Sequence, residues 1–157
     1  MINNLRITEQ DFSGQFSDVL IGIVISDFNE TITSKLLEGC VKKLQAHAPN
    51  AQIEIVHVPG AVEIPLVLQE MAEQEFDALI ALGAVVRGDT SHYDYVCEQV
   101  SRGCQQIMLE YSLPVIFGVL TTDNDEQALD RVGGKHGHKG ADAALAALQM
   151  ILTLERM

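Results

Sequence analysis

The stretch from Arg87 to His92 reads RGDTSH and combines residue types that serve anion binding and proton transfer. Gly88 allows a ligand to approach the backbone closely, and the residues after it precede a predicted helix, whose free N–H groups can bind a phosphate. His92 carries an imidazole, the type of side chain that can exchange protons at cellular pH. Two simpler interpretations stay open: Thr90 or Ser91 only caps the helix, and His92 is structural or solvated.

Two further cations matter in a chain that has only ten lysines and arginines. The planar guanidinium of Arg131 can bind a phosphate through two hydrogen bonds, although most arginines on helix surfaces have no such role. Lys139 begins the last predicted helix, where a cation opposes the helix dipole and needs compensation. Asp142, three residues on, is the candidate partner of Lys139.

Three residues near the ends of predicted strands have side chains that suit an organic ligand. Phe28 can stack on a flat heterocycle, or it can cover the edge of the core. Asn29 can cap the next helix or hydrogen-bond the polar edge of a ligand. Glu63 can stabilise a helix start, or it can accept hydrogen bonds from ligand hydroxyls.

The cysteines and the C-terminal histidines do not predict a metal site or a disulfide framework. The three cysteines are widely spaced and fall in apolar helical patterns, at Cys40, Cys97 and Cys104. His136 and His138 flank a glycine, but no cysteine or carboxylate at ligand spacing accompanies them. We therefore expect no metal.

The composition predicts one globular domain over residues 1–157, because 47% of the residues are hydrophobic and only 20% are charged. The net charge of -12 argues against nucleic-acid and anionic-membrane binding, since both need a basic face. The N-terminus lacks the layout of a signal peptide, and no apolar run is long enough to cross a bilayer. We expect a cytoplasmic protein that buries some apolar surface in subunit contacts.

The apolar pattern alternates between strands and helices. We predict strands at residues 20–26, 52–58, 77–84 and 114–120, and helices at residues 31–47, 61–74, 93–111, 124–132 and 139–155. In the short fourth helix, Asn124 is the expected N-cap, with Gln127 three residues on. This order predicts a three-layer α/β fold with a parallel sheet between helices, and ligands then bind beyond the carboxyl ends of the strands.

Residues 1–16 form an N-terminal arm with four large apolar residues and no clear partner in this scheme: Leu5, Ile7, Phe12 and Phe16. Three alternatives are open for the arm. It forms an edge strand, it pairs with a neighbouring subunit, or it is a frayed terminus.

Five stretches in this order resemble the 6,7-dimethyl-8-ribityllumazine synthase family of riboflavin biosynthesis. They are FNETIT from Phe28, VPGAVEIPL from Val58, ALGAVVRGDTSHYDYV from Ala81, PVIFGVLTTDNDEQALDR from Pro114 and GGKHGHKGADAA from Gly133. The resemblance implies a flavodoxin-like, four-stranded parallel sheet flanked by helices. It implies a transferase that joins 5-amino-6-(D-ribitylamino)uracil to 3,4-dihydroxy-2-butanone 4-phosphate, releases phosphate and water, and uses no metal or organic cofactor.

The resemblance also implies an assembly. Members of the family form homopentamers, and the short GGKHG link resembles members that build icosahedral capsids from pentamers. A riboflavin synthase would be a further protein partner. Two small-molecule substrates would be the ligands.

Site residues carry over one by one from the same resemblance. The pyrimidine and ribityl contacts would be Phe28, Asn29, Ala61, Val62, Glu63, Ala84, Val85, Val86, Phe117 and Lys139. Phe28 would stack on the ring, and Phe117 would close the pocket from the adjacent subunit. The N–H groups of Asp89 and Thr90, with Arg131, would hold the phosphate, and His92 would transfer protons. Asp89 stands where the family usually has a small uncharged residue, so its carboxylate must point away from the anion.

Two other functions fit the same fold. A flavodoxin-like electron carrier predicts a glycine- and hydroxyl-rich loop after the first strand, and SDFNE at residues 26–30 does not provide one. A non-catalytic shell subunit would not need His92 and Arg131. Lumazine formation from both substrates separates these alternatives from the enzyme.

Overall fold

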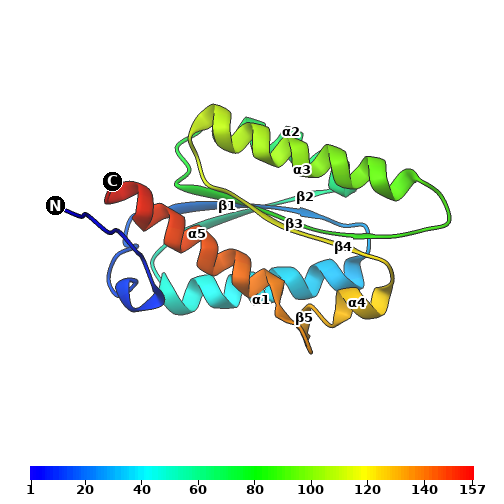
Figure 1. The fold of residues 1–157 in the computed structure, drawn as a ribbon, viewed down its shortest axis with the longest axis horizontal. Coiled ribbons are helices and arrows are strands. Elements are labelled where there is room, and N and C mark those ends of the chain that lie inside the picture. The colour runs from blue at the N-terminus through cyan, green and yellow to red at the C-terminus, as the bar shows by residue number, and fades with distance from the viewer.

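A four-stranded parallel sheet forms the centre of the protein (Figure 1). The structure is a computed structural model and describes all 157 residues. The strands are β1 (Leu20–Ser26), β2 (Gln52–Val58), β3 (Ala78–Val86) and β4 (Val115–Thr122), in the order β2-β1-β3-β4. Each neighbouring pair is parallel, so all four carboxyl ends lie at one edge. The two central strands are buried on both faces, which explains their continuous apolar sequences.

Helices cover both faces of the sheet and complete the predicted three layers. α1 (Glu30–His47) and α5 (Lys139–Glu155) lie on one face, and α2 (Ile64–Ala72) and α3 (His92–Tyr111) lie on the other (Figure 1). A cluster of 24 buried apolar residues joins the sheet to α1 and α5, and a cluster of 14 joins it to α2 and α3. None of the helices combines the length and the apolar character that a membrane crossing requires.

The predicted elements mostly agree with the observed bounds. The strands at 20–26 and 52–58 and the helix at 139–155 are confirmed to the residue. The predicted helix at 61–74 is divided into a 3-10 turn, η2 (Ala61–Glu63), and α2, with Pro65 in the first turn of α2. The fourth helix is shorter than predicted, as α4 (Asp125–Leu129), and Asn124 caps it by accepting a 2.8 Å bond from the N–H of Gln127.

A small hairpin between α4 and α5 was not predicted. β5 (Val132–Gly134) pairs antiparallel with β6 (Gly137–His138). Gly133 and Gly137 adopt φ values of 104° and 75°, which glycine reaches without strain. The hairpin therefore explains why this link is rich in glycine.

The N-terminal arm packs on the chain's own core, which corrects the expectation that it has no partner within the domain. The arm contains a 3-10 turn, η1 (Glu9–Asp11), and no strand, so the edge-strand alternative is wrong. Phe12 and Phe16 are buried in the cluster beside α1 and α5, and the Phe12 ring lies edge-on to His47 of α1. Asp11 is 3.5 Å from Arg156 beyond α5. Burial of two aromatic rings favours this packing over exposure at a sheet edge.

α1 and α5 cross at very short range. A Cβ at Gly140 of α5 would meet the backbone carbonyl of Leu36, and a Cβ at Gly39 of α1 would meet the ring of His138. The ring Nδ1 of His138 accepts a 3.3 Å bond from the N–H of Ala141 and caps α5. This crossing fixes the start of α5, where Lys139 lies.

Candidate active site

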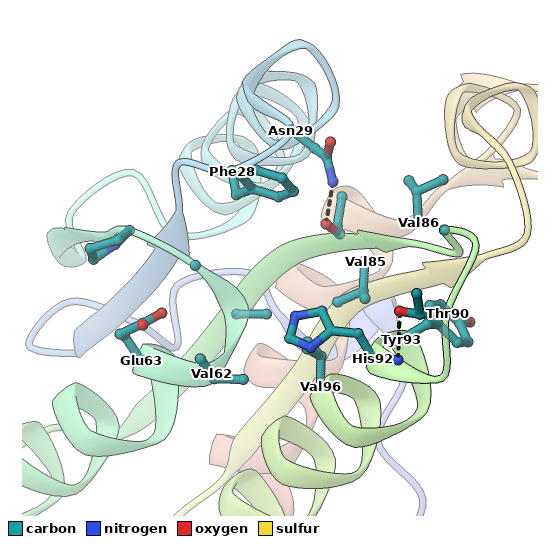
Figure 2. Close-up of a pocket in the computed structure, with 15 residues that line it drawn as sticks. Phe28, Asn29, Val62, Glu63, Val85, Val86, Thr90, His92, Tyr93 and Val96 are labelled. Carbon is teal, nitrogen blue, oxygen red and sulfur yellow. Dashed lines mark hydrogen bonds between the residues drawn. The ribbon is translucent and has the colours of Figure 1, made fainter.

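A cavity of about 460 Å³ opens at the carboxyl ends of β1, β2 and β3. Fifteen residues line it, and they come from the end of β3, from the segments after β1, β2 and β3, and from the first turns of α3 (Figure 2). Ten of the residues predicted for the site from sequence line this cavity: Phe28, Asn29, Ala61, Val62, Glu63, Ala84, Val85, Val86, Thr90 and His92. The topological rule for parallel sheets thus located the cavity correctly.

Phe28 presents its ring at one wall of the cavity and is 72% exposed. Its N–H donates to the carbonyl of Pro59 at 3.0 Å, which ties the segment after β1 to the segment after β2. An exposed aromatic ring at a cavity wall is suited to stack on a flat ligand. Because Phe28 is exposed, covering the core is not its main role.

Asn29 reaches across the cavity wall and does not cap α1 with its side chain. Its φ of 62° places it in the left-handed region, and its amide nitrogen donates to the carbonyl of Ala84 at 2.8 Å (Figure 2). This bond joins the segment after β1 to the end of β3. Asn29 is thus the N-cap residue of α1 by position, but its side chain makes no capping bond because it is engaged with the neighbouring strand.

The segment between β3 and α3 presents backbone and small side chains at the other wall. Gly88 and Thr90 line the cavity, whereas Asp89 between them is exposed and lies outside the lining. The hydroxyl of Thr90 accepts a 3.3 Å bond from the N–H of His92, so Thr90 partly caps α3. Ser91 makes no capping bond with its side chain.

His92 begins α3 and is exposed at the mouth of the cavity, with its ring directed toward Val62 (Figure 2). The ring makes no hydrogen bond within the chain, so it is free to exchange a proton with a bound molecule. Glu63 and Val62 lie on the opposite wall in η2, and a Glu63 carboxylate oxygen lies 3.0 Å from the site that a Cβ at Gly60 would occupy. Glycine at position 60 therefore leaves room for the carboxylate.

Three further predicted residues lie in a second cavity of about 350 Å³, between β4 and the start of α5, and Asp89 lines neither cavity. Phe117, Arg131 and Lys139 line it, and Phe117 is 43% exposed. The guanidinium of Arg131 donates to the carbonyl of Gln127 at 2.8 Å. Lys139 is 3.6 Å from Asp142, as predicted. One chain thus does not bring Arg131 into the cavity that holds Thr90 and His92.

A charged cluster beside the first cavity was not singled out from the sequence. Arg87 contacts Asp123, Asp94 and the ring of Tyr93. The hydrogen bond to Asp123 and the nearby charges of Asp94 and Asp123 raise the pKa of the Arg87 guanidinium against a smaller lowering by burial. Tyr93 itself lines the cavity.

The thiols and the histidines do not form a reactive or metal-binding cluster. Burial raises the pKa of both Cys40 and Cys104 to about 12, so these thiols stay protonated. Cys97 is partly buried, and all three cysteines are free. No group of three or more His, Cys, Asp or Glu side chains lies together in a way that could hold a metal ion.

Comparison with known proteins gives one consistent result. A family model described as 6,7-dimethyl-8-ribityllumazine synthase matches residues 18–155. Two proteins of that name are each 51% identical to this chain over 143 residues, one from Coxiella burnetii strain CbuG_Q212 and one from C. burnetii strain RSA 493 / Nine Mile phase I. Each alignment covers 90% of this chain and 95% of the relative. The matched residues include both cavities.

Proposed function

Because this chain belongs to the 6,7-dimethyl-8-ribityllumazine synthase family, we propose that it condenses 5-amino-6-(D-ribitylamino)uracil with 3,4-dihydroxy-2-butanone 4-phosphate in the cavity that Phe28 and His92 line. The products are 6,7-dimethyl-8-ribityllumazine, phosphate and water, and the reaction is the penultimate step of riboflavin biosynthesis. The observation that carries the proposal is the joint lining of one cavity by an exposed aromatic ring, a carboxylate and an imidazole, in a chain of this family.

The pyrimidine occupies the apolar part of the cavity. Its ring stacks on Phe28, and its polar edge faces backbone groups of Val85 and Val86 at the end of β3. The ribityl hydroxyls donate to the carboxylate of Glu63. Asn29 holds the segment after β1 against Ala84 and so fixes the ring-binding wall.

The phosphorylated substrate binds at the start of α3. The N–H groups of Asp89 and Thr90 donate to the phosphate, which the N-terminal end of the helix dipole also stabilises. The exposure of Asp89 outside the cavity lining supports this assignment, because its carboxylate need not face the anion. Arg131 supplies the positive charge.

The reaction needs proton transfer and stabilisation of a leaving anion. The amine of the pyrimidine attacks the ketone and forms an imine with loss of water, phosphate leaves by elimination, and ring closure releases a second water. His92 relays protons, since its free ring stands at the cavity mouth. The N–H donors and Arg131 stabilise the negative charge that develops on phosphate. Holding two substrates together supplies a large part of the rate.

We propose that the complete site lies between two copies of the chain. Phe117, Arg131 and Lys139 gather in the second cavity, apart from His92. A neighbouring copy that places its second cavity over the first would bring Arg131 to the phosphate and Phe117 to the ring. This arrangement requires an oligomer, which we propose to be a homopentamer that further assembles into an icosahedral capsid.

Three finer proposals accompany the enzyme. The exposed N-terminal residues before Ile7 pair with a neighbouring subunit. A riboflavin synthase is the protein partner that takes up the lumazine. The enzyme works in the cytoplasm, in keeping with three cysteines that form no disulfide.

One assay tests the function. The purified protein is mixed with both substrates, and lumazine absorbance and fluorescence are followed against the uncatalysed reaction. We expect formation well above the uncatalysed rate. Formation at the uncatalysed rate would refute the enzyme and favour the non-catalytic shell subunit, whereas tight FMN binding with a redox cycle would favour the electron carrier.

A further inference from the structure

The side chain of Arg87 joins three segments at the edge of the first cavity. Its Nε donates to Asp123 Oδ1 at 3.0 Å, in the turn after β4, and its Nη1 lies 3.6 Å from Asp94 Oδ1, in the first turn of α3. Its guanidinium carbon lies 4.2 Å from the centre of the Tyr93 ring. Its own N–H donates to the carbonyl of Thr122 at 2.8 Å and continues the pairing of β3 with β4.

These contacts occupy the positive charge of Arg87. Two carboxylates face one guanidinium, so the cluster has no free positive charge to offer an anion. The hydrogen bond to Asp123 is the main cause that raises the pKa of Arg87, and the residue remains charged. Arg87 is therefore better suited to hold the surrounding chain than to bind phosphate directly.

The segment that follows Arg87, residues 88–92, makes few contacts of its own. Residues 88–92 are all exposed, and a Cβ at Gly88 would meet no atom within 4 Å. The only side-chain bond within the segment is the 3.3 Å contact between Thr90 and the N–H of His92. Such a segment takes its shape from its two ends, and Arg87 connects those ends by reaching from β3 to Tyr93 and Asp94.

The cluster also reaches toward Arg131. The N–H of Asp123 donates to the side-chain oxygen of Gln127 at 2.8 Å, and the backbone carbonyl of Gln127 accepts from Arg131 at 2.8 Å. A series of contacts thus leads from Arg87 through the start of α4 to Arg131 of the second cavity.

We propose that Arg87 is a positioning residue that holds the N–H groups of residues 89 and 90 in the geometry that binds the phosphate of the substrate. The inference rests on the proposed function and goes beyond it, because Arg87 itself touches no substrate. Its loss should weaken use of the phosphorylated substrate and leave pyrimidine binding at Phe28 largely intact.

Steady-state kinetics of two variants test the proposal, with the intact protein and both substrates. Arg87→Met removes the charge and the guanidinium and keeps an unbranched apolar stem. We expect it to raise KM for 3,4-dihydroxy-2-butanone 4-phosphate about tenfold, within the ~100-fold loss that an ångström-scale misplacement can cause. KM for the pyrimidine should stay within about twofold. Arg87→Lys should recover part of the loss, since an ammonium keeps the ion pairs but not the planar contact with Tyr93.

Asp123→Ala separates positioning from direct binding, because the two roles predict opposite signs. A positioning Arg87 that loses Asp123 holds the segment less well, so KM for the phosphorylated substrate rises. An Arg87 that binds phosphate directly would be released from a competing carboxylate, so that KM would fall. Arg156→Met is the matched control: it removes an arginine that pairs with Asp11 at the opposite end of the fold, and it should change neither KM.

Hydrogen exchange provides a readout that does not depend on turnover. In Arg87→Met, the amides of His92 and Asp94, which donate to Thr90 and Ser91, should exchange faster than in the wild-type protein, while those of β1 should not change. An active wild-type enzyme with an unchanged KM in Arg87→Met, or with a lowered KM in Asp123→Ala, would overturn the inference alone. A wild-type protein that forms no lumazine would instead overturn the proposed function. If Arg87→Met does not fold, Arg87→Lys and Asp123→Ala decide the question.

Discussion

Replacing Phe28 with alanine should weaken binding of the pyrimidine substrate by an amount that the structure allows us to calculate. A phenylalanine offers about 150–250 Å² of surface, and Phe28 is 72% exposed, so roughly 110–180 Å² is open to a ligand. A pyrimidine ring that covers half of this surface gains roughly 1.3–2.3 kcal/mol at about 25 cal/mol per Å². Since ~1.4 kcal/mol corresponds to a factor of ten, Phe28→Ala should weaken binding roughly 10- to 40-fold.

Phe28→Leu is the informative comparison, because leucine keeps an apolar side chain but has no aromatic face. It should lose about 2- to 10-fold in affinity, from the ~0.5–1.5 kcal/mol that aromatic stacking adds to simple area burial. Titration calorimetry with 5-amino-6-(D-ribitylamino)uracil measures both losses at equilibrium. The thermal unfolding midpoint serves as the control and should not change, since Phe28 is largely outside the core.

Two results would refute this reasoning. If Phe28→Ala binds the pyrimidine as tightly as the wild-type protein, the ring does not stack on Phe28. If affinity and the unfolding midpoint fall together, the ring supports the fold and its effect on binding is indirect.

Four further predictions follow from named contacts. Arg131→Ala should raise KM for the phosphorylated substrate far more than KM for the pyrimidine, and equal changes in steady-state kinetics would contradict its role at the phosphate. His92→Ala should slow turnover but leave residual activity, because the substrates remain positioned, and an unchanged rate at every pH would exclude proton transfer by this ring. Gly140→Ala should lower the free energy of unfolding by about 1–3 kcal/mol in urea titrations, because the added Cβ meets the α1 backbone. Alanine has the better helix propensity, so unchanged or raised stability would show that α1 and α5 can move apart to accept the Cβ. Cys40 and Cys104 should resist a thiol reagent in the folded protein. Between pH 9 and their folded pKa of about 12, the unfolded chain releases protons that the folded chain keeps, so the free energy of unfolding should fall as pH rises through this range. A free energy of unfolding that does not change there would contradict the burial of these thiols.

The sequence predicted the central sheet well for a physical reason. The strand at residues 20–26 is buried on both faces, so it appears as a short apolar run rich in β-branched residues, which is typical of a strand in a parallel sheet. The hairpin of β5 and β6 escaped prediction because its strands have three and two residues, too few for any alternation of apolar and polar side chains. The arm around Phe12 and Phe16 escaped prediction because its burial depends on contacts with residues of α1 and α5, and packing against elements that are distant in sequence leaves no local pattern.

The site was predictable only in part. Topology places the ends of parallel strands at one edge, and this placed Phe28, Glu63 and His92 in one cavity. Topology does not determine on which side of β4 the side chain of Arg131 lies, so it could not reveal that Arg131 lines a second cavity. The pairing of Arg87 with Asp123, 36 residues later, depends on the register of β3 against β4 and could not be found from spacing.

The most direct test of the account is the crystal structure of the protein with 6,7-dimethyl-8-ribityllumazine and inorganic phosphate. We expect the lumazine ring against Phe28, and phosphate at the N–H groups of residues 89 and 90 with an Arg131 guanidinium beside it. Phosphate bound elsewhere, with the start of α3 empty while the ring is in place, would contradict it.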